Sequence, residues 1–337
     1  DGVLKLSGTF NIEGSTPQVG DYNNGKIVGY RDNALIYADE WTYTGNNADV
    51  DNIGSWGDII VVDGTKLSKS GLITENADHT ITLAAPSASI SSVADYAKAS
   101  LAYSIDESQN PIIAGSSDVT LSAITFGSSA SIDLTGTGLR GITRDNYNGE
   151  SNSAGALSDA KCVCTGNITG AGAALTLDFR NVGGYPVYRH TLNGLVGVAD
   201  GVSVSGLTFA AASGDNYNFD IKPFTTEDNN NAVFCGSVAG RAKGSFTASG
   251  VTVNTKFNAQ NDNAKKAYHI GGLVAQTSTS ISNITVSDST LNVTINDSND
   301  KLDNTIGGAI GWLNYTGNDS ISWSFSDLNI QGSITSN

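Results

Sequence analysis

Four copies of a short phrase recur in the second half of the chain, and their spacing constrains the fold more than any other feature. The copies are Asn193–Gly197, Gly236–Gly240, Gly271–Ala275 and Gly307–Gly311. One β-branched residue from each, in the order Val196, Val238, Val274 and Ile310, gives spacings of 42, 36 and 36 residues. Each copy leads into a run in which apolar and polar residues alternate, as in a β-strand with one buried face. Such periodic, strand-type sequence predicts a solenoid, whose coils bury their apolar edges by stacking on one another.

We therefore expect an all-β fold, a right-handed parallel β-helix (solenoid) that forms one domain over residues 1–337. Residues 1–91 are expected to form N-terminal coils, 92–118 a helix and its connection, and 119–337 the coils that carry the repeats. A short helix is predicted over residues 93–105, because Ser92-Val-Ala-Asp95 reads as a capping box and is followed by apolar residues at helical spacing. We expect this helix to lie over an open end or a flank of the stack.

Composition agrees with stacked strands and excludes some partners. The chain has 39 glycines and only 5 prolines, which suits tight turns between strands better than a disordered tail. Its net charge is −15 with charged residues at 15%, so it lacks the Lys/Arg clusters that bind nucleic acid or anionic membranes. No stretch approaches the roughly 20 apolar residues of a membrane span. We expect the mature segment of a larger exported protein, located outside the cell at its surface.

Polar, asparagine-rich gaps separate the repeats at residues 214–231, 258–266 and 296–304. Because the gaps recur at equivalent points, they should emerge on one side of the stack, either as a binding face or as tolerated surface loops. Aromatic rings that flank polar residues suit stacking on sugars. We therefore predict weak glycan binding at four aromatic residues, with the alternative that these rings cap the core: Tyr217, Phe219, Trp312 and Tyr315.

One polar turn offers oxygen ligands for calcium, and no other cofactor is expected. In this turn Asp145, Asn148 and Glu150 surround a glycine, although the full twelve-residue calcium loop is absent. An Asx-rich turn without metal is the alternative. The cysteines number three, which is odd, and we favour buried small side chains or one disulfide over a zinc site.

No known catalytic motif occurs in the chain, so no catalytic residue is predicted. Carbohydrate cleavage needs two positioned carboxylates, or a metal with a basic residue. The nearest arrangement is Tyr188-Arg-His190 with Asp178 and Arg180 upstream. A hydrogen-bonded coil edge explains it better than an active site.

The repeated phrase, best seen in Gly271–Ala275, resembles the glycine-rich "GLUG" repeats of large bacterial cell-surface adhesins. The stretch Ile132–Asn146 resembles the segment that leads into such repeats, whereas Asn193 and Ser237 replace a second glycine. The resemblance implies a parallel β-helix, export from a bacterium, and attachment to a surface. Our hypothesis is an extracellular adhesive rod that presents loops to a host or bacterial surface receptor, with a glycan as one ligand. The alternatives are a polysaccharide-cleaving β-helix enzyme and a self-assembling filament subunit.

Overall fold

The fold is described from a computed structural model of the chain. Before residue 87 it describes only the strands β1 to β6. Beyond them the described residues are 87–102, 119–137, 139, 141–143, 162–182, 190–221, 232–259, 267–297, 305–314 and 321–336.

The elements before the repeats are one helix and a series of short strands. They are β1 (Gly2–Asn11), β2 (Lys26–Arg31), β3 (Ala34–Thr42), β4 (Ile59–Val62), β5 (Ile73–Glu75), β6 (Ile81–Leu83), β7 (Ser87–Ile90), α1 (Val93–Ala102), β8 (Val119–Phe126), β9 (Ser131–Asp133), β10 (Cys162–Thr169), β11 (Ala174–Thr176) and β12 (Phe179–Val182).

In the repeat region all the elements of the described residues are strands. They are β13 (His190–Asn193), β14 (Val196–Ser205), β15 (Thr208–Phe209), β16 (Phe219–Ile221), β17 (Ala232–Gly236), β18 (Ala239–Ser249), β19 (Thr252–Ala259), β20 (Ala267–Gly271), β21 (Val274–Asp297), β22 (Thr305–Gly307), β23 (Ile310–Trp312) and β24 (Ser322–Ser336).

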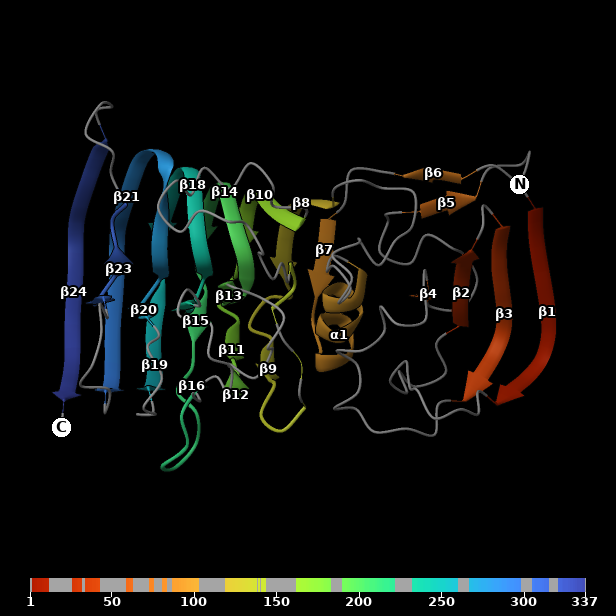
Figure 1. The fold of residues 1–337 in the computed structure, drawn as a ribbon, viewed down its shortest axis with the longest axis horizontal. Helices are drawn as coiled ribbons and strands as arrows, with labels where there is room; N and C mark the ends of the chain where they lie inside the picture. The colour runs from red at the N-terminus through yellow and green to blue at the C-terminus, as the bar shows by residue number, and fades with distance from the viewer. Residues whose placement is uncertain are drawn as a thin grey trace.

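Successive coils of the chain pair with one another through parallel strands. One face runs in the order β7-β8-β10-β14-β18-β21, and β24 pairs with the outer side of β21. A second face runs from β9 through β11, β15 and β19 to β21, and a separate four-stranded sheet has the order β13-β17-β20-β22. The result is a parallel β-solenoid of about four turns, drawn along its length in Figure 1. This confirms the all-β solenoid that the repeats predict.

Inward-facing apolar side chains form ladders along the axis of the stack. In β19, for example, buried and half-buried residues alternate from Thr252 to Ala259, as expected for a strand with one face in the core. Two ladders are Val204–Ala248–Val286 and Phe209–Val253–Leu291, and all their members are at most 1% exposed. Each fully buried apolar side chain contributes about 1.5–3 kcal/mol, so the coils stabilise one another through a continuous column.

An aromatic stack continues the same column. The Phe179 and Phe219 ring centroids are 4.8 Å apart with planes inclined by 7°, and Phe257 follows 4.7 Å further on, inclined by 14°. These residues occupy register-matched positions in β12, β16 and β19. The strand spacing of about 4.8 Å therefore sets the ring spacing, and identical residues in successive coils stack face to face.

One corner of the solenoid requires a left-handed backbone conformation in successive coils. Because Ser205, Ser249, Ser287 and Ser326 are in register, the residues that follow them occupy the same corner. These residues are Gly206 (φ 60°), Gly250 (φ 60°), Asp288 (φ 48°) and Asp327 (φ 47°). Glycine adopts this conformation without strain and aspartate tolerates it, which explains why these two types occupy the corner.

The helix α1 confirms the predicted helix over Val93–Ala102, and residues 103–105 of the prediction lie outside the described residues. The Asp95 amide donates to Ser92 Oγ at 3.1 Å, and the Ser92 hydroxyl donates to the Asp95 carboxylate at 2.8 Å, which is the expected N-cap. Tyr96, Ala97 and Ala99 are buried in the core, and burial raises the pKa of the Tyr96 phenol. Figure 1 places α1 beside β7, at the end of the stack opposite β24.

The first strands form sheets of their own. β1 and β3 are parallel, but β2 is antiparallel to both β3 and β4, and β5 is antiparallel to β6. Parallel coils over residues 1–91 therefore do not describe these strands, and the parallel stack starts with β7 at Ser87. Antiparallel strands can be joined by short turns. This part of the sequence contains no repeat phrase that would distinguish parallel from antiparallel pairing. Among the described residues, no helix has the length and hydropathy to cross a membrane.

Replacing Phe219 by alanine tests the column. The substitution removes the middle ring of the stack, and we expect it to lower the free energy of unfolding by about 3–5 kcal/mol, measured by urea denaturation. The control is Tyr217→Ala at a half-buried ring two residues earlier, for which we expect a loss of at most about 1 kcal/mol. Equal losses in the two variants would contradict the placement of Phe219 in the core.

Substitutions at Asp288 test the corner. A β-branched side chain is strained at positive φ, so Asp288→Val should lower the free energy of unfolding by about 1–2 kcal/mol. Asp288→Gly should leave it within about 0.5 kcal/mol of the parent protein, and so should Thr285→Val on an outward position of the same strand. If Asp288→Val leaves the free energy of unfolding unchanged in urea titrations, the backbone at this corner is not left-handed.

Candidate functional site

The sequence gaps between repeats connect equivalent positions of successive coils. The strands that lead into the gaps end in register, because Ile221 pairs with Ala259 and Ala259 pairs with Asp297. The strands that follow begin in register as well, with Ala232 opposite Ala267. The flanks thus agree with the prediction that the gaps leave the stack at one side. Most gap residues lie outside the described part of the chain, apart from the segment 214–221.

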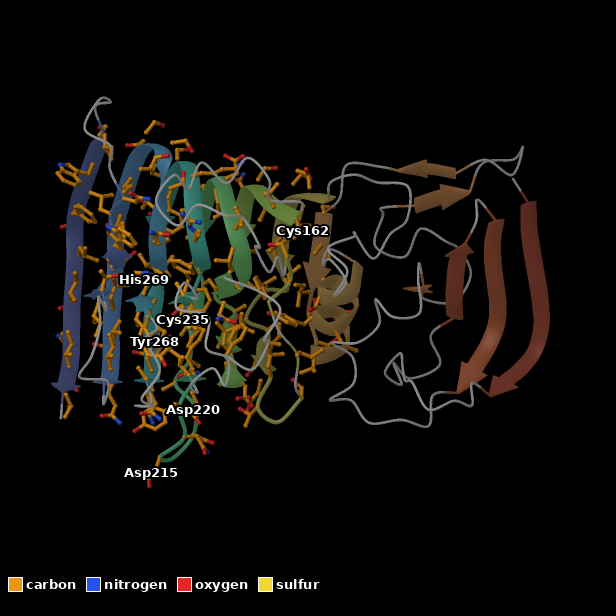
Figure 2. The ribbon with its side chains drawn as sticks, viewed as in Figure 1. Cys162, Asp215, Asp220, Cys235, Tyr268 and His269 are labelled. Carbon is orange, nitrogen blue, oxygen red and sulfur yellow. The ribbon has the colours of Figure 1, made fainter. Side chains whose placement is uncertain are left out.

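A loop that is described in full contains the beginning of the first of these gaps. It spans residues 210–218 between β15 and β16, and we call it the 210–218 loop. Its tip, Ser213–Asn216, is exposed, whereas Tyr217 is half-buried and Asn218 is 1% exposed. Figure 2 shows Asp215 at the end of this loop, away from the strands. The loop therefore combines an accessible tip with a buried base.

Asn218 fixes the base of the 210–218 loop. Its side-chain amide donates to the carbonyls of Leu177 and Ala210, both at 3.0 Å. Its side-chain oxygen accepts from the amides of Ala212, at 3.1 Å, and Lys256, at 3.0 Å. A buried side-chain amide that satisfies donors and acceptors on both neighbouring coils holds the loop in one conformation.

Lys256 holds the outer part of the same loop from the next coil. Its ammonium group donates to the Gly214 carbonyl at 2.6 Å and to the Ala212 carbonyl at 3.2 Å. The Asn216 side chain closes the tip by donating to the Ser213 carbonyl at 3.0 Å. Since these bonds use backbone carbonyls, the carboxylate of Asp215 stays at the exposed tip.

The chemistry of the loop suits hydrogen bonding to a hydroxylated ligand. The tip offers the Ser213 hydroxyl and the Asp215 carboxylate, and the half-buried Tyr217 follows in the same loop. Within residues 210–218 Asp215 is the sole carboxylate, and hydrolysis of a glycosidic bond by the usual route needs two. The nearby Asp220 side chain accepts a hydrogen bond at 2.8 Å from Asn258, which in turn accepts one from Asn296 at 2.8 Å. This amide ladder ties the coils together on the outside.

Of the four aromatic residues predicted to bind a glycan, Phe219 is assigned wrongly. Its side chain is 0% exposed and lies in the phenylalanine stack, because it points inward from β16. Tyr217, Phe219 and Ile221 are spaced by two residues, so from sequence a strand would place all three on one face. The strand β16 begins only at Phe219, which separates Phe219 and Ile221 from Tyr217. Tyr217 does belong to the 210–218 loop, and Tyr315 lies outside the described residues.

Trp312 occupies a different surface. It is half-buried in β23, with its ring 4.8 Å from His269 and inclined by 38°. The strands β18 and β21 separate its coil from that of Tyr217. The structure therefore does not bring Tyr217 and Trp312 into one site.

Sequence reasoning missed a stack of side chains outside the main core. The Phe234 and His269 rings lie 4.7 Å apart, the Arg241 guanidinium lies 5.3 Å from the Phe234 ring centre, and His269 Nδ1 is 2.7 Å from Thr305 Oγ1. The signal was present, since Phe234, His269 and Thr305 each lie two residues before the first glycine of a repeat phrase.

The remaining predicted sites lie mostly outside the described residues or have a structural explanation. Asp145, Asn148 and Glu150 lie outside them, and the described part of the chain contains no group of three or more His, Cys, Asp or Glu residues placed to hold a metal ion. Asp178 is 7% exposed and accepts a hydrogen bond from the Gly136 amide at 2.6 Å, so it supports a turn. The Tyr188 and Arg189 positions lie outside the described residues.

All three cysteines are buried, in agreement with their interpretation as small core side chains. Burial raises the pKa of the Cys164 thiol to about 12. Burial also raises the pKa of the Cys235 thiol, against the opposing effect of a hydrogen bond from Asn193. Thiolate is the reactive form, so these two side chains are poor nucleophiles at neutral pH. Figure 2 shows Cys162 and Cys235 on different coils.

Comparisons with known proteins identify no relative. No model of a protein family, no curated protein and no solved structure matches the chain. The resemblance of the glycine-rich phrases to GLUG repeats therefore stays a prediction.

Replacing Asn218 by alanine tests how the 210–218 loop is held. The substitution leaves buried donors and acceptors on two coils without their hydrogen-bond partner. We therefore expect a loss of at least about 2 kcal/mol in the free energy of unfolding. Hydrogen exchange at the Ala212 and Lys256 amides should also become faster. Asn216→Ala, at the exposed tip, should change stability by at most about 0.5 kcal/mol. Unchanged exchange in Asn218→Ala would refute the anchoring role.

Proposed function

We propose that the protein is an extracellular structural and adhesive rod, in which the solenoid positions exposed loops for contact with a host or bacterial surface. The observation that carries this proposal is the 210–218 loop, whose exposed tip is fixed by Asn218 and Lys256 to two successive coils. A loop held in this way presents its polar groups without losing conformational entropy on binding. The resemblance to GLUG repeats supports the location at a bacterial surface.

The ligand class follows from the groups at the tip. A carboxylate, a hydroxyl and a half-buried tyrosine ring suit a hydroxylated ligand such as a glycan on a surface receptor. With a formal net charge of −15 the protein disfavours nucleic acid and anionic membrane surfaces as partners. The rod function requires no catalytic residue and no cofactor.

Glycan-array binding of the whole chain tests the proposal. Removing the ring in Tyr217→Ala should weaken binding at least about tenfold, and Asp215→Asn should weaken it because the amide is a poorer acceptor. The matched control is Asp288→Asn, which makes the same change of charge at an exposed corner outside the loop. Circular dichroism and urea denaturation must show that both loop variants are fully folded under the conditions of the binding assay.

Two results would contradict the proposal. If all three variants bind like the parent protein, the 210–218 loop is not the contact site. If the protein shortens members of a polysaccharide panel, the polysaccharide-cleaving enzyme becomes the better reading.

A further inference from the structure

The last strand, β24, carries large apolar side chains that are exposed at the end of the stack. The exposed fractions are 60% for Trp323, 49% for Phe325, 52% for Ile330 and 61% for Ile334. Each of these four residues pairs in register with a residue of β21 that is at most 1% exposed. In the same order, the partners are Ile284, Val286, Leu291 and Ile295. The exposed residues therefore have the inward orientation of core positions but lack a covering coil. Exposed apolar surface of this kind marks an interaction site.

The backbone edge of β24 is equally open to pairing. In the described part of the chain β24 pairs with β21 alone, over positions 322–336. Edge strands that avoid pairing carry lysine, proline or inward-pointing charges. β24 has none of these, and its one ionisable residue, Asp327, sits at the corner. The formal net charge of the whole chain is −15, but little of this charge lies on β24 to repel a second copy.

The opposite end of the stack does not offer a matching edge. There α1 lies beside β7, and Tyr96, at 0% exposure, belongs to the core together with Ala97 and Ala99. A second copy cannot place a bare β7 end against β24 without displacing this helix. Copies that meet through the ends of their parallel stacks therefore use the β24 end of each, which gives a closed two-fold contact.

The second half of β24 is self-complementary in one antiparallel register. If two copies of residues 328–336 pair about Gly332, Ile330 of each copy faces Ile334 of the other on the inner face. On the outer face Gln331 then lies opposite Ser333, and Asn329 lies opposite Thr335. These pairs join like with like, and only the outermost pair, Leu328 with Ser336, is mixed. A slip by one residue would set isoleucine against polar side chains. Gly332 at the centre has no side chain to obstruct the approach.

We infer that β24 is the docking edge for a second copy of this chain, paired antiparallel about Gly332. The pairing buries Ile330 and Ile334 of both copies and satisfies backbone groups along the edge. Trp323 and Phe325 lie beyond the corner at Asp327 and have no assigned partner in this pairing. The inference does not rest on the proposed adhesive function, and its test needs no ligand.

Sedimentation equilibrium of the whole chain at several concentrations provides the first test. The protein should fit a monomer–dimer equilibrium, and Ile334→Lys should raise the dissociation constant at least about tenfold, because it places a charge against Ile330 of the other copy. Thr335→Lys, on the outer face of the same strand, is the matched control and should have a smaller effect. Circular dichroism and the urea midpoint check that each variant is folded.

Disulfide trapping tests the register. Under mild oxidation the double variant Gln331→Cys/Ser333→Cys should form a covalent dimer, since these positions face each other across the two-fold axis. Asn329→Cys/Ser333→Cys, which has the same number of added thiols in the wrong register, should form much less. Alkylation before denaturation keeps the buried native cysteines from contributing.

Three outcomes would overturn the inference. A protein that stays monomeric at all concentrations leaves β24 for a different partner. Association that grows beyond the dimer contradicts a closed contact. A dimer that survives Ile334→Lys but dissociates in Trp323→Ser uses the other half of the strand.

Discussion

Parallel hydrogen-bonded ladders between successive coils are the interaction on which the rest of this structure depends. They place each inward residue directly above its counterpart in the previous coil, as in Val204, Ala248 and Val286. The hydrophobic core is consequently a column, in which every coil is stabilised mainly by its neighbours. The same register stacks the phenylalanines, aligns the left-handed corner and joins the outer asparagines into ladders. None of these features would survive a shift of one residue in the pairing.

Much of this arrangement could be predicted from sequence, because repeats encode register. The phrase at Gly271 and its relatives located the coils, and the capping box at Ser92 located the helix. The spacing from valine to valine sets Val196 opposite Val238, whereas the structure pairs Val196 with Ala239. The difference of one residue arises in the glycine turn, whose backbone path is not fixed by the apolar pattern. The first strands carry no repeat, so their antiparallel pairing was beyond this reasoning.

The candidate site was harder to predict than the fold. Phe219 and Tyr217 are two residues apart in one polar segment, and only the position of the strand β16 decides that the phenylalanine is internal. The contribution of Asn218 depends on groups up to 41 positions away in the sequence, such as the Leu177 carbonyl, and no local pattern announces it. Lys256 likewise acts on a loop of the preceding coil. Functional geometry in a solenoid is set between coils, so it becomes visible once the register is known.

The two ends of the stack and its side differ in structure. The α1 end is closed by a helix, the β24 end is open and apolar, and the 210–218 loop projects from the side. The most direct test of the central claim is the pattern of nuclear Overhauser effects between backbone protons of β14, β18 and β21. Parallel coils predict contacts that link Ser203 to Thr247 and Thr247 to Thr285, with sequence order increasing in the same direction along all three strands. Contacts that run in opposite directions along neighbouring strands would contradict the column and every inference drawn from it.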